Sequence, residues 1–172
     1  MIMKNLLIIA FIFSSFLGFS QLSTVEQEVL DEINLVRTDP SSYVQYIDNF
    51  LDYWDSGAAE RKTAQELIEI LENLEPLPEL KYSEVLYESC KKHAKFLKRT
   101  GKFQHSDAPY AENIQYGNEY VRYAIIDLLI DHGVPDRGHR NNLLNPDIRE
   151  MGVYYIEEVN ENMMHLFVQQ FK

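Results

Sequence analysis

The stretch PDRGHRNNLLNP, residues 135–146, marks the point at which the pattern of apolar residues changes from helical to strand-like. Residues 138–144 predict one short turn of helix, which the following Asn-Pro pair ends because proline cannot continue a helix. After it, residues 151–156 and 163–171 are rich in β-branched and aromatic side chains. The intervening EEVNEN is turn-like, so we expect a C-terminal β-hairpin.

Upstream of this stretch, the apolar residues recur mainly at helical spacing. Ser23 and Glu26 have the spacing of a capping box at the start of the first helix, and residues 55–62 are polar and predict a loop. The expected helices cover residues 24–37, about 40–51, 63–74, 83–100 and 119–131. Residues 102–117 lack a sustained helical period and predict a long loop with a short strand around Ile114. This order favours an α+β fold, in which helices pack on both sides of a small, mainly antiparallel sheet.

The N-terminus, MIMKNLLIIAFIFSSFLGFS, places Lys4 before an apolar run that ends in small residues. This pattern is typical of a cleavable secretory signal peptide, residues 1–20. The run is too short to be a transmembrane helix. We therefore expect a mature chain, residues 21–172, that forms one domain outside the cell or in the periplasm and has no transmembrane segment.

Composition excludes several classes of function. The net charge is −11, which argues against nucleic acid as a partner because phosphate binding requires clustered Lys and Arg. Cys90 is the only cysteine, so no intrachain disulfide can form, and its helical spacing predicts a core position. The sequence contains no G-x-S-x-G, HExxH, phosphate-binding glycine loop or EF-hand motif.

Two histidines lie where the regular patterns break. His105, in QHSD, is followed closely by Glu112 in AENI, and His139 follows Asp131 and Asp136. If they converge in the fold, two imidazoles and two or three carboxylates form a divalent-cation site or an acid/base pair. The alternative is that both histidines cap loops through hydrogen bonds to the backbone.

Other charged residues have simpler expected roles. His93 is expected at the surface or boundary of its helix, and His165 alternates within a strand. The arginines near His139 are expected to pair with acids such as Asp131, Asp136 or Glu150, because a guanidinium binds a carboxylate through two parallel hydrogen bonds. These arginines are Arg137, Arg140 and Arg149.

The blocks HSDAPYAENI and LLIDHGVPDRGHRNNLLNPDIREMGV, in this order, resemble the CAP superfamily of cysteine-rich secretory, antigen 5 and pathogenesis-related proteins. Asn34 and Arg37, in INLVRTDPSSY, match the N-x-x-R helix of that family. The resemblance covers nearly the whole mature chain, and the lone cysteine matches the bacterial SCP-like extracellular type. It implies an α-β-α sandwich, the CAP fold.

The resemblance also implies a central cavity lined by two histidines and two acids. By motif, these are His105, Glu112 and His139, and Asp131 stands where the eukaryotic branch has the glutamate of W-x-x-E. Several family members bind a divalent cation through the histidines. The matching residues expected to be structural are Asn34, Arg37, Asn113, Arg137 and Arg140.

Three functions remain open at this point. The first is a secreted module that binds a lipid, peptide or glycan with the help of a divalent cation (zinc, calcium or magnesium) held by His105 and His139. The second is a metal-dependent hydrolase in which Glu112, or Asp131, activates a bound water. The third is a purely structural tetrad that ties the helical and strand layers together.

Overall fold

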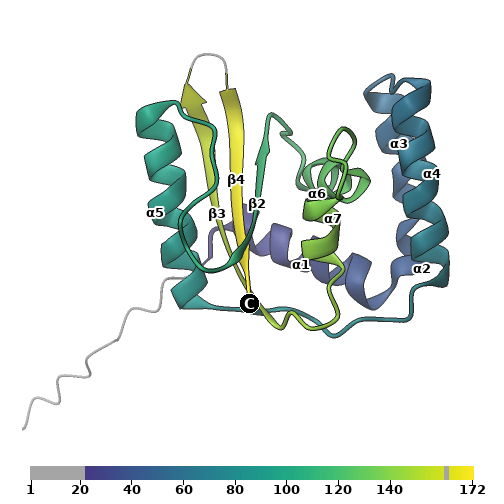
Figure 1. Cartoon of the computed structure of the whole chain (residues 1–172), viewed down its shortest axis with the longest axis horizontal. Helices are drawn as coiled ribbons and strands as arrows, with labels where there is room; N and C mark the ends of the chain where they lie inside the picture. The colour runs from purple at the N-terminus through teal and green to yellow at the C-terminus, as the bar shows by residue number, and fades with distance from the viewer. Residues whose placement is uncertain (1–21, 161–162) are drawn as a thin grey trace, which may run out of the picture.

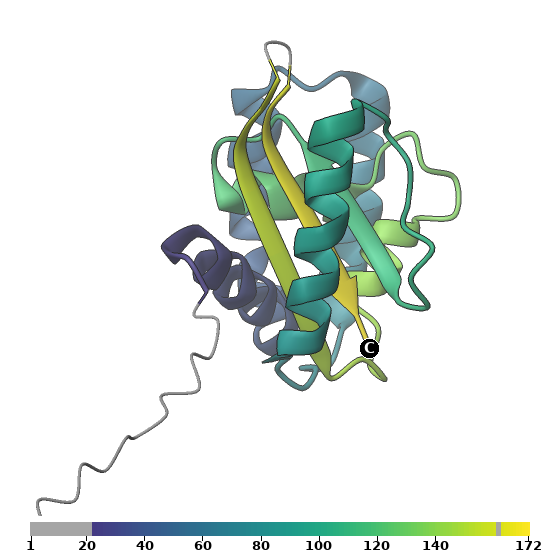
Figure 2. The same cartoon turned by 90° about the vertical axis from the view of Figure 1, so that its left-hand side faces the viewer.

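The computed structural model describes residues 22–160 and 163–172. Figures 1 and 2 show a small sheet with helices against both of its faces. The signal peptide expected at residues 1–20 lies outside the described residues. Within those residues, no helix combines the length and the apolar character needed to cross a membrane.

The sheet is built mainly from the C-terminal hairpin. Its strands are β1 (Lys81–Tyr82), β2 (Ala111–Tyr116), β3 (Glu150–Asn160) and β4 (Met163–Phe171), in the order β1-β3-β4-β2. Only the short β1–β3 pair is parallel, so the predicted hairpin and mainly antiparallel sheet are confirmed. Strand β3 continues through the first four residues of the EEVNEN segment expected to be the turn, because these residues still pair with β4 across a register shift.

The helices agree with the predicted periodicity in most places. They are α1 (Thr24–Thr38), α2 (Pro40–Tyr43), α3 (Gln45–Tyr53), α4 (Ala58–Asn73), α5 (Glu84–Thr100), α6 (Val121–Ile130) and α7 (Gly138–Leu143). The capping box is confirmed: the Glu26 amide donates to Ser23 Oγ at 3.3 Å, and the Ser23 amide donates to Glu26 Oε2 at 2.8 Å.

Two predictions about the region after α1 were wrong. The single expected helix is divided into α2 and α3 at Val44. The loop expected over residues 55–62 is short, because α4 begins directly after Gly57. The residues from Ala58 to Lys62 are mostly strong helix formers, so their polarity reflects an exposed helix face rather than a loop.

The helices form two layers around the sheet (Figure 1). Helix α5 covers one face of β3 and β4, where Cys90, Ala94 and Leu97 pack against Leu166 and Val168. Cys90 is fully buried, as predicted. Helix α1 contacts β3, and helix α7 contacts β2, on the opposite side of the sheet from α5, while α3 and α4 pack on α6 farther out. The predicted α-β-α arrangement is therefore confirmed.

A buried arginine joins α1 to the segment that carries α7. The Arg37 guanidinium donates to the carbonyl oxygens of Pro78, Leu143, Asn145 and Ile148 at 2.8–3.3 Å. One turn earlier, Asn34 binds both the amide and the carbonyl of Leu80, at 2.7 and 3.0 Å. These contacts hold the proline-rich connector and the end of α7 against α1. They therefore set the position of α7, on which His139 lies.

Candidate functional site

The first half of the candidate site is a histidine–glutamate pair beside β2. His105 Nδ1 lies 2.9 Å from Glu112 Oε1, which also accepts the Ser106 amide at 2.9 Å. From β4, Gln170 Nε2 donates to Glu112 Oε2 at 2.7 Å, because Gln170 is directly opposite Glu112 in the sheet. The Glu112 side chain is only 4% exposed, whereas the His105 side chain is 62% exposed. The carboxylate is thus fixed inside, and the imidazole reaches solvent.

The second half is a histidine–aspartate pair between α6 and α7. Asp131 follows α6 in the left-handed conformation, with φ of 54°, which turns the chain out of the helix. Its buried side chain accepts the His139 amide at 2.9 Å and lies 2.7 Å from His139 Nδ1. The shorter side chain at the family's glutamate position therefore still contacts the second histidine.

The two pairs lie side by side. The imidazole centroids of His105 and His139 are 6.5 Å apart, and their planes meet at 37°. Each ring directs Nδ1 to a carboxylate, which favours the tautomer with the proton on Nδ1. Among residues 22–160 and 163–172, neither Nε2 has a hydrogen-bond partner. Each Nε2 is therefore free to accept a proton or a hydrogen bond, or to bind a metal ion.

Hollows adjoin both histidines. His139 and Asp131 line one of about 270 Å³ together with Phe103 and Asp127. His105 lines another of about 360 Å³, beside α5. Burial raises the pKa of Asp127 above its ordinary value. The hollow beside His139 is therefore partly dry at Asp127, which disfavours the charged form of that carboxyl.

Asn113 fastens α7 to the sheet next to the site. Its amide nitrogen donates to the His139 carbonyl at 3.3 Å, and its amide oxygen accepts from Asn142 at 2.8 Å. Asn113 is fully buried on β2. It thus connects the strand that carries Glu112 with the helix that carries His139.

His93 is a site neighbour that the sequence analysis placed wrongly. It is buried, its Nε2 lies 2.9 Å from the Gln104 carbonyl oxygen, and the same atom is 3.7 Å from Glu112 Oε1. The signal was present in the spacing, because His93 falls between Cys90 and Leu97 on the buried stripe of α5. Gln170 was also missed, since nothing local to β4 indicates that it faces Glu112.

The arginines near His139 have different partners from those expected. Arg140 donates to the carbonyl oxygens of Leu129 and Ile130 at 2.6 and 2.8 Å. Arg137 donates to the backbone carbonyl oxygens of Asp131 and Val134. It also contacts the Glu66 carboxylate, at 3.4 Å.

Arg149 likewise binds backbone carbonyls, those of Pro146 and Ile148, rather than a neighbouring acid. Arg140 binds carbonyl groups at the end of α6 because a helix leaves its last carbonyl groups without backbone donors. Guanidinium groups supply those donors, and the Asp131 carboxylate remains available for His139.

Hydrogen bonding controls the charge of Glu112. Burial alone would raise its pKa, but hydrogen bonds from Gln170, Ser106 and His105 outweigh burial and lower the pKa below its ordinary value of 4.5. Because the native pKa is depressed, these bonds stabilise the fold above about pH 4.5, and their contribution is lost as the pH falls through the native pKa.

We expect Glu112→Gln to cost about 1–2 kcal/mol at pH 7, since the charged acceptor is lost. The difference from the wild type should shrink as the pH falls below about 4.5 and through the lowered native pKa, because the protonated wild-type carboxyl resembles the amide. Denaturant unfolding of both proteins between pH 7 and 3 measures this difference. A constant difference over that range would contradict the assigned role of the Glu112 charge.

The combination of an α-β-α sandwich with two facing histidine–carboxylate pairs defines the class of protein. The sequence profile of CAP, the cysteine-rich secretory protein family, matches residues 30–171. The chain therefore belongs to the CAP family, and the resemblance seen in the sequence is confirmed. A search of curated protein sequences found no match.

Solved structures with a similar fold include the crystal structure of NaASP2 with Zn²⁺, at 13% identity and a TM-score of 0.51, covering 86% of this chain and 80% of that chain. An outer surface protein from Borrelia burgdorferi is 17% identical with a TM-score of 0.45, covering 66% of this chain and 88% of that one. Hookworm platelet inhibitor is 10% identical with a TM-score of 0.47, covering 88% and 72% respectively. At these identities the likeness concerns the fold.

Proposed function

We propose that this CAP protein is secreted and binds a divalent cation through His105 and His139, and that the cation helps to hold a lipid, peptide or glycan ligand. The observation that carries the proposal is the orientation of the two imidazoles. Both rings are held at Nδ1 by buried carboxylates and have Nε2 without a protein partner in the described part of the chain. Histidines that bind metal ions in proteins are commonly oriented in this way.

The donor set limits what kind of metal site this is. In the described ranges, no group of three or more His, Cys, Asp or Glu side chains is arranged to hold an ion. A catalytic zinc usually has three protein ligands. The two histidines would thus form a site of moderate affinity, in which water or the ligand supplies the remaining donors.

Imidazole ligands favour zinc over calcium and magnesium, which prefer oxygen. A zinc complex has been solved for NaASP2, which has a similar fold. When bound, a zinc ion would supply a Lewis acid that attracts carbonyl, carboxylate or phosphate oxygens of a ligand.

The geometry supports binding better than hydrolysis. Glu112, the candidate base, already accepts hydrogen bonds from His105, Ser106 and Gln170 and is buried. A carboxylate with a lowered pKa is also a weak base. Asp131 is similarly occupied by His139.

Zinc titration by calorimetry tests the proposal. We expect His105→Ala combined with His139→Ala to weaken zinc binding at least about 100-fold, because both nitrogen donors are lost. Asp131→Asn should weaken it about 10–100-fold, since the ring of His139 loses its orienting carboxylate. The matched control is His165→Ala, at the other end of β4, which should leave zinc binding unchanged.

Two results would contradict the metal site. One is equal zinc affinity in the wild type and the double variant, and the other is an equal loss in the His165 control. If the double variant instead lowers the melting temperature by many degrees and the wild type binds no zinc, calcium or magnesium, the tetrad is structural. Metal-dependent turnover of peptides or esters that the double variant abolishes would establish the hydrolase.

A further inference from the structure

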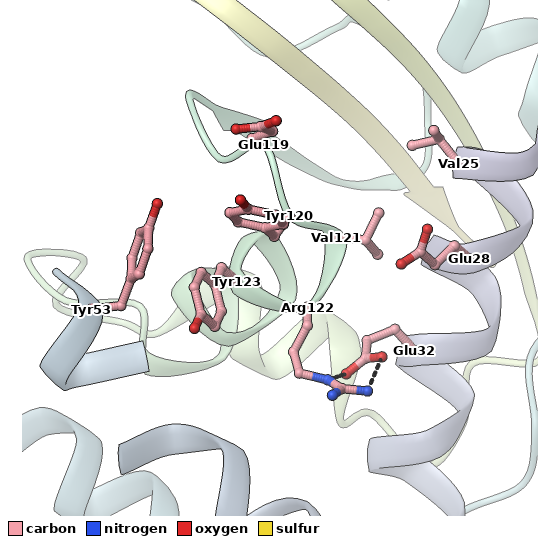
Figure 3. Close-up of a pocket in the computed structure, with 9 residues that line it drawn as sticks. All are labelled: Val25, Glu28, Glu32, Tyr53, Glu119, Tyr120, Val121, Arg122 and Tyr123. Atoms are coloured by element: carbon pink, nitrogen blue, oxygen red, sulfur yellow. Dashed lines mark hydrogen bonds and ion pairs between the residues drawn. The ribbon is translucent and has the colours of Figure 1, made fainter. Parts of the chain in front are cut away.

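Another pocket, separate from the two hollows beside the histidines, lies between α1, the end of α3 and the start of α6. It has a volume of about 590 Å³, and Figure 3 shows the residues that line it. On one side are three tyrosines, Tyr53, Tyr120 and Tyr123, and on the other side α1 contributes Glu28 and Glu32. The pocket therefore combines aromatic rings with carboxylates, and it belongs to a different part of the molecule from the histidine pairs.

The tyrosines form a preorganised aromatic wall. The Tyr53 centroid is 5.0 Å from Tyr123 and 6.2 Å from Tyr120, and Tyr120 and Tyr123 are 5.7 Å apart. These contacts hold the rings against one another. Tyr53 and Tyr120 are nevertheless 56% and 53% exposed, so their outer surfaces remain accessible to a ligand. The face of an aromatic ring carries partial negative charge and attracts cations.

The charged side of the pocket has an excess of negative charge. Arg122, its cation, donates to both Glu32 oxygens at 2.7 and 3.1 Å and lies 4.0 Å from the Tyr46 centroid. The charge of Arg122 is thus neutralised, and the Tyr46 contact shows a cation on an aromatic face of this region. Glu28 and Glu119 also line the pocket. Both are exposed and have no ion-pair partner within residues 22–160 and 163–172.

We propose that this pocket binds an organic cation, an ammonium group that carries small alkyl substituents. The tyrosine faces would contact the charged head and its alkyl groups, while Glu28 and Glu119 neutralise its charge. An anionic ligand is disfavoured by the unpaired carboxylates. A neutral ligand would gain no charge attraction from them and could use them only as hydrogen-bond acceptors.

The experiment compares choline with 3,3-dimethyl-1-butanol, which has the same shape but carbon in place of the ammonium nitrogen. Trp54 is the only tryptophan of the chain, and its ring centroid is 5.2 Å from Tyr53, so its fluorescence reports on the tyrosine wall. Saturation-transfer NMR of the ligand methyl groups gives a second readout. We expect choline to bind at least about tenfold more tightly than the neutral analogue, and we expect added salt to weaken its binding.

Three variants locate the contact. Tyr120→Leu should weaken choline binding about fivefold or more, because the aromatic face is lost. Tyr120→Phe, the matched control, keeps the face and should bind within about twofold of the wild type. His105→Ala should not change choline binding, which separates this pocket from the proposed metal site.

The proposal is overturned if choline does not bind by either readout, or if the neutral analogue binds as tightly. It also fails if Tyr120→Leu binds choline like the wild type. If Tyr120→Phe loses as much affinity as Tyr120→Leu, or a neutral oligosaccharide displaces choline, the pocket binds hydroxyl-rich ligands through hydrogen bonds instead.

Discussion

Replacement of Arg37 by methionine is expected to lower the free energy of unfolding by about 3–5 kcal/mol, the largest loss that we predict for a single side chain. Methionine can fill part of the volume of the arginine but has no donor. The carbonyl oxygens of Pro78, Leu143, Asn145 and Ile148 would then lose the guanidinium that binds them. An acceptor left without a partner in a buried site costs about 1–3 kcal/mol.

Unfolding in guanidinium chloride and thermal melting measure this loss of stability. We expect the melting temperature of Arg37→Met to lie about 10 °C below that of the wild type. Arg37→Lys should lie between the wild type and Arg37→Met, because one ammonium group cannot reach four carbonyls in a planar arrangement. Arg99→Met, at an exposed position near the end of α5, is the control and should change stability by less than about 0.5 kcal/mol. A loss below about 1 kcal/mol for Arg37→Met would show that these bonds do not anchor α1.

Replacement of Gly152 by alanine is expected to destabilise the fold by about 3 kcal/mol or more. Strand β3 passes so close to α5 at this position that a Cβ atom would lie 2.3 Å from the backbone C of Leu86 and N of Tyr87. Backbone atoms of a packed helix cannot move aside as a flexible side chain can. The strand and the helix would have to separate, which disturbs the packing of the whole layer.

The matched control is the same substitution at Gly138. There a Cβ atom would meet the Asp136 carboxylate at 3.7 Å, an ordinary contact distance. We expect the free energy of unfolding of Gly138→Ala, measured in guanidinium chloride, to lie within about 0.5 kcal/mol of that of the wild type. If the two substitutions lowered the free energy of unfolding equally, the close approach of β3 and α5 would not be what excludes a side chain at position 152.

Local patterns in the sequence were sufficient to predict the secondary structure and the layers of this protein. Amphipathic spacing, the Ser23–Glu26 capping box and the β-branched hairpin residues each depend on neighbours within a few positions. The wrong predictions also came from local patterns. Polarity alone could not distinguish the exposed first turn of α4 from a loop. The basic surroundings of His93 concealed that its position lies on the buried stripe of α5.

The sequence by itself predicted the CAP fold and the four residues His105, Glu112, Asp131 and His139 of the candidate site, because motifs and periodicity are local. Each histidine even lies close along the chain to its carboxylate. Only the tertiary structure decided that the two pairs face each other, and that Gln170 on β4 holds Glu112 together with the nearby Ser106 and His105. The physical reason is that these contacts join segments distant in sequence, so they depend on how β2, β4, α6 and α7 pack together.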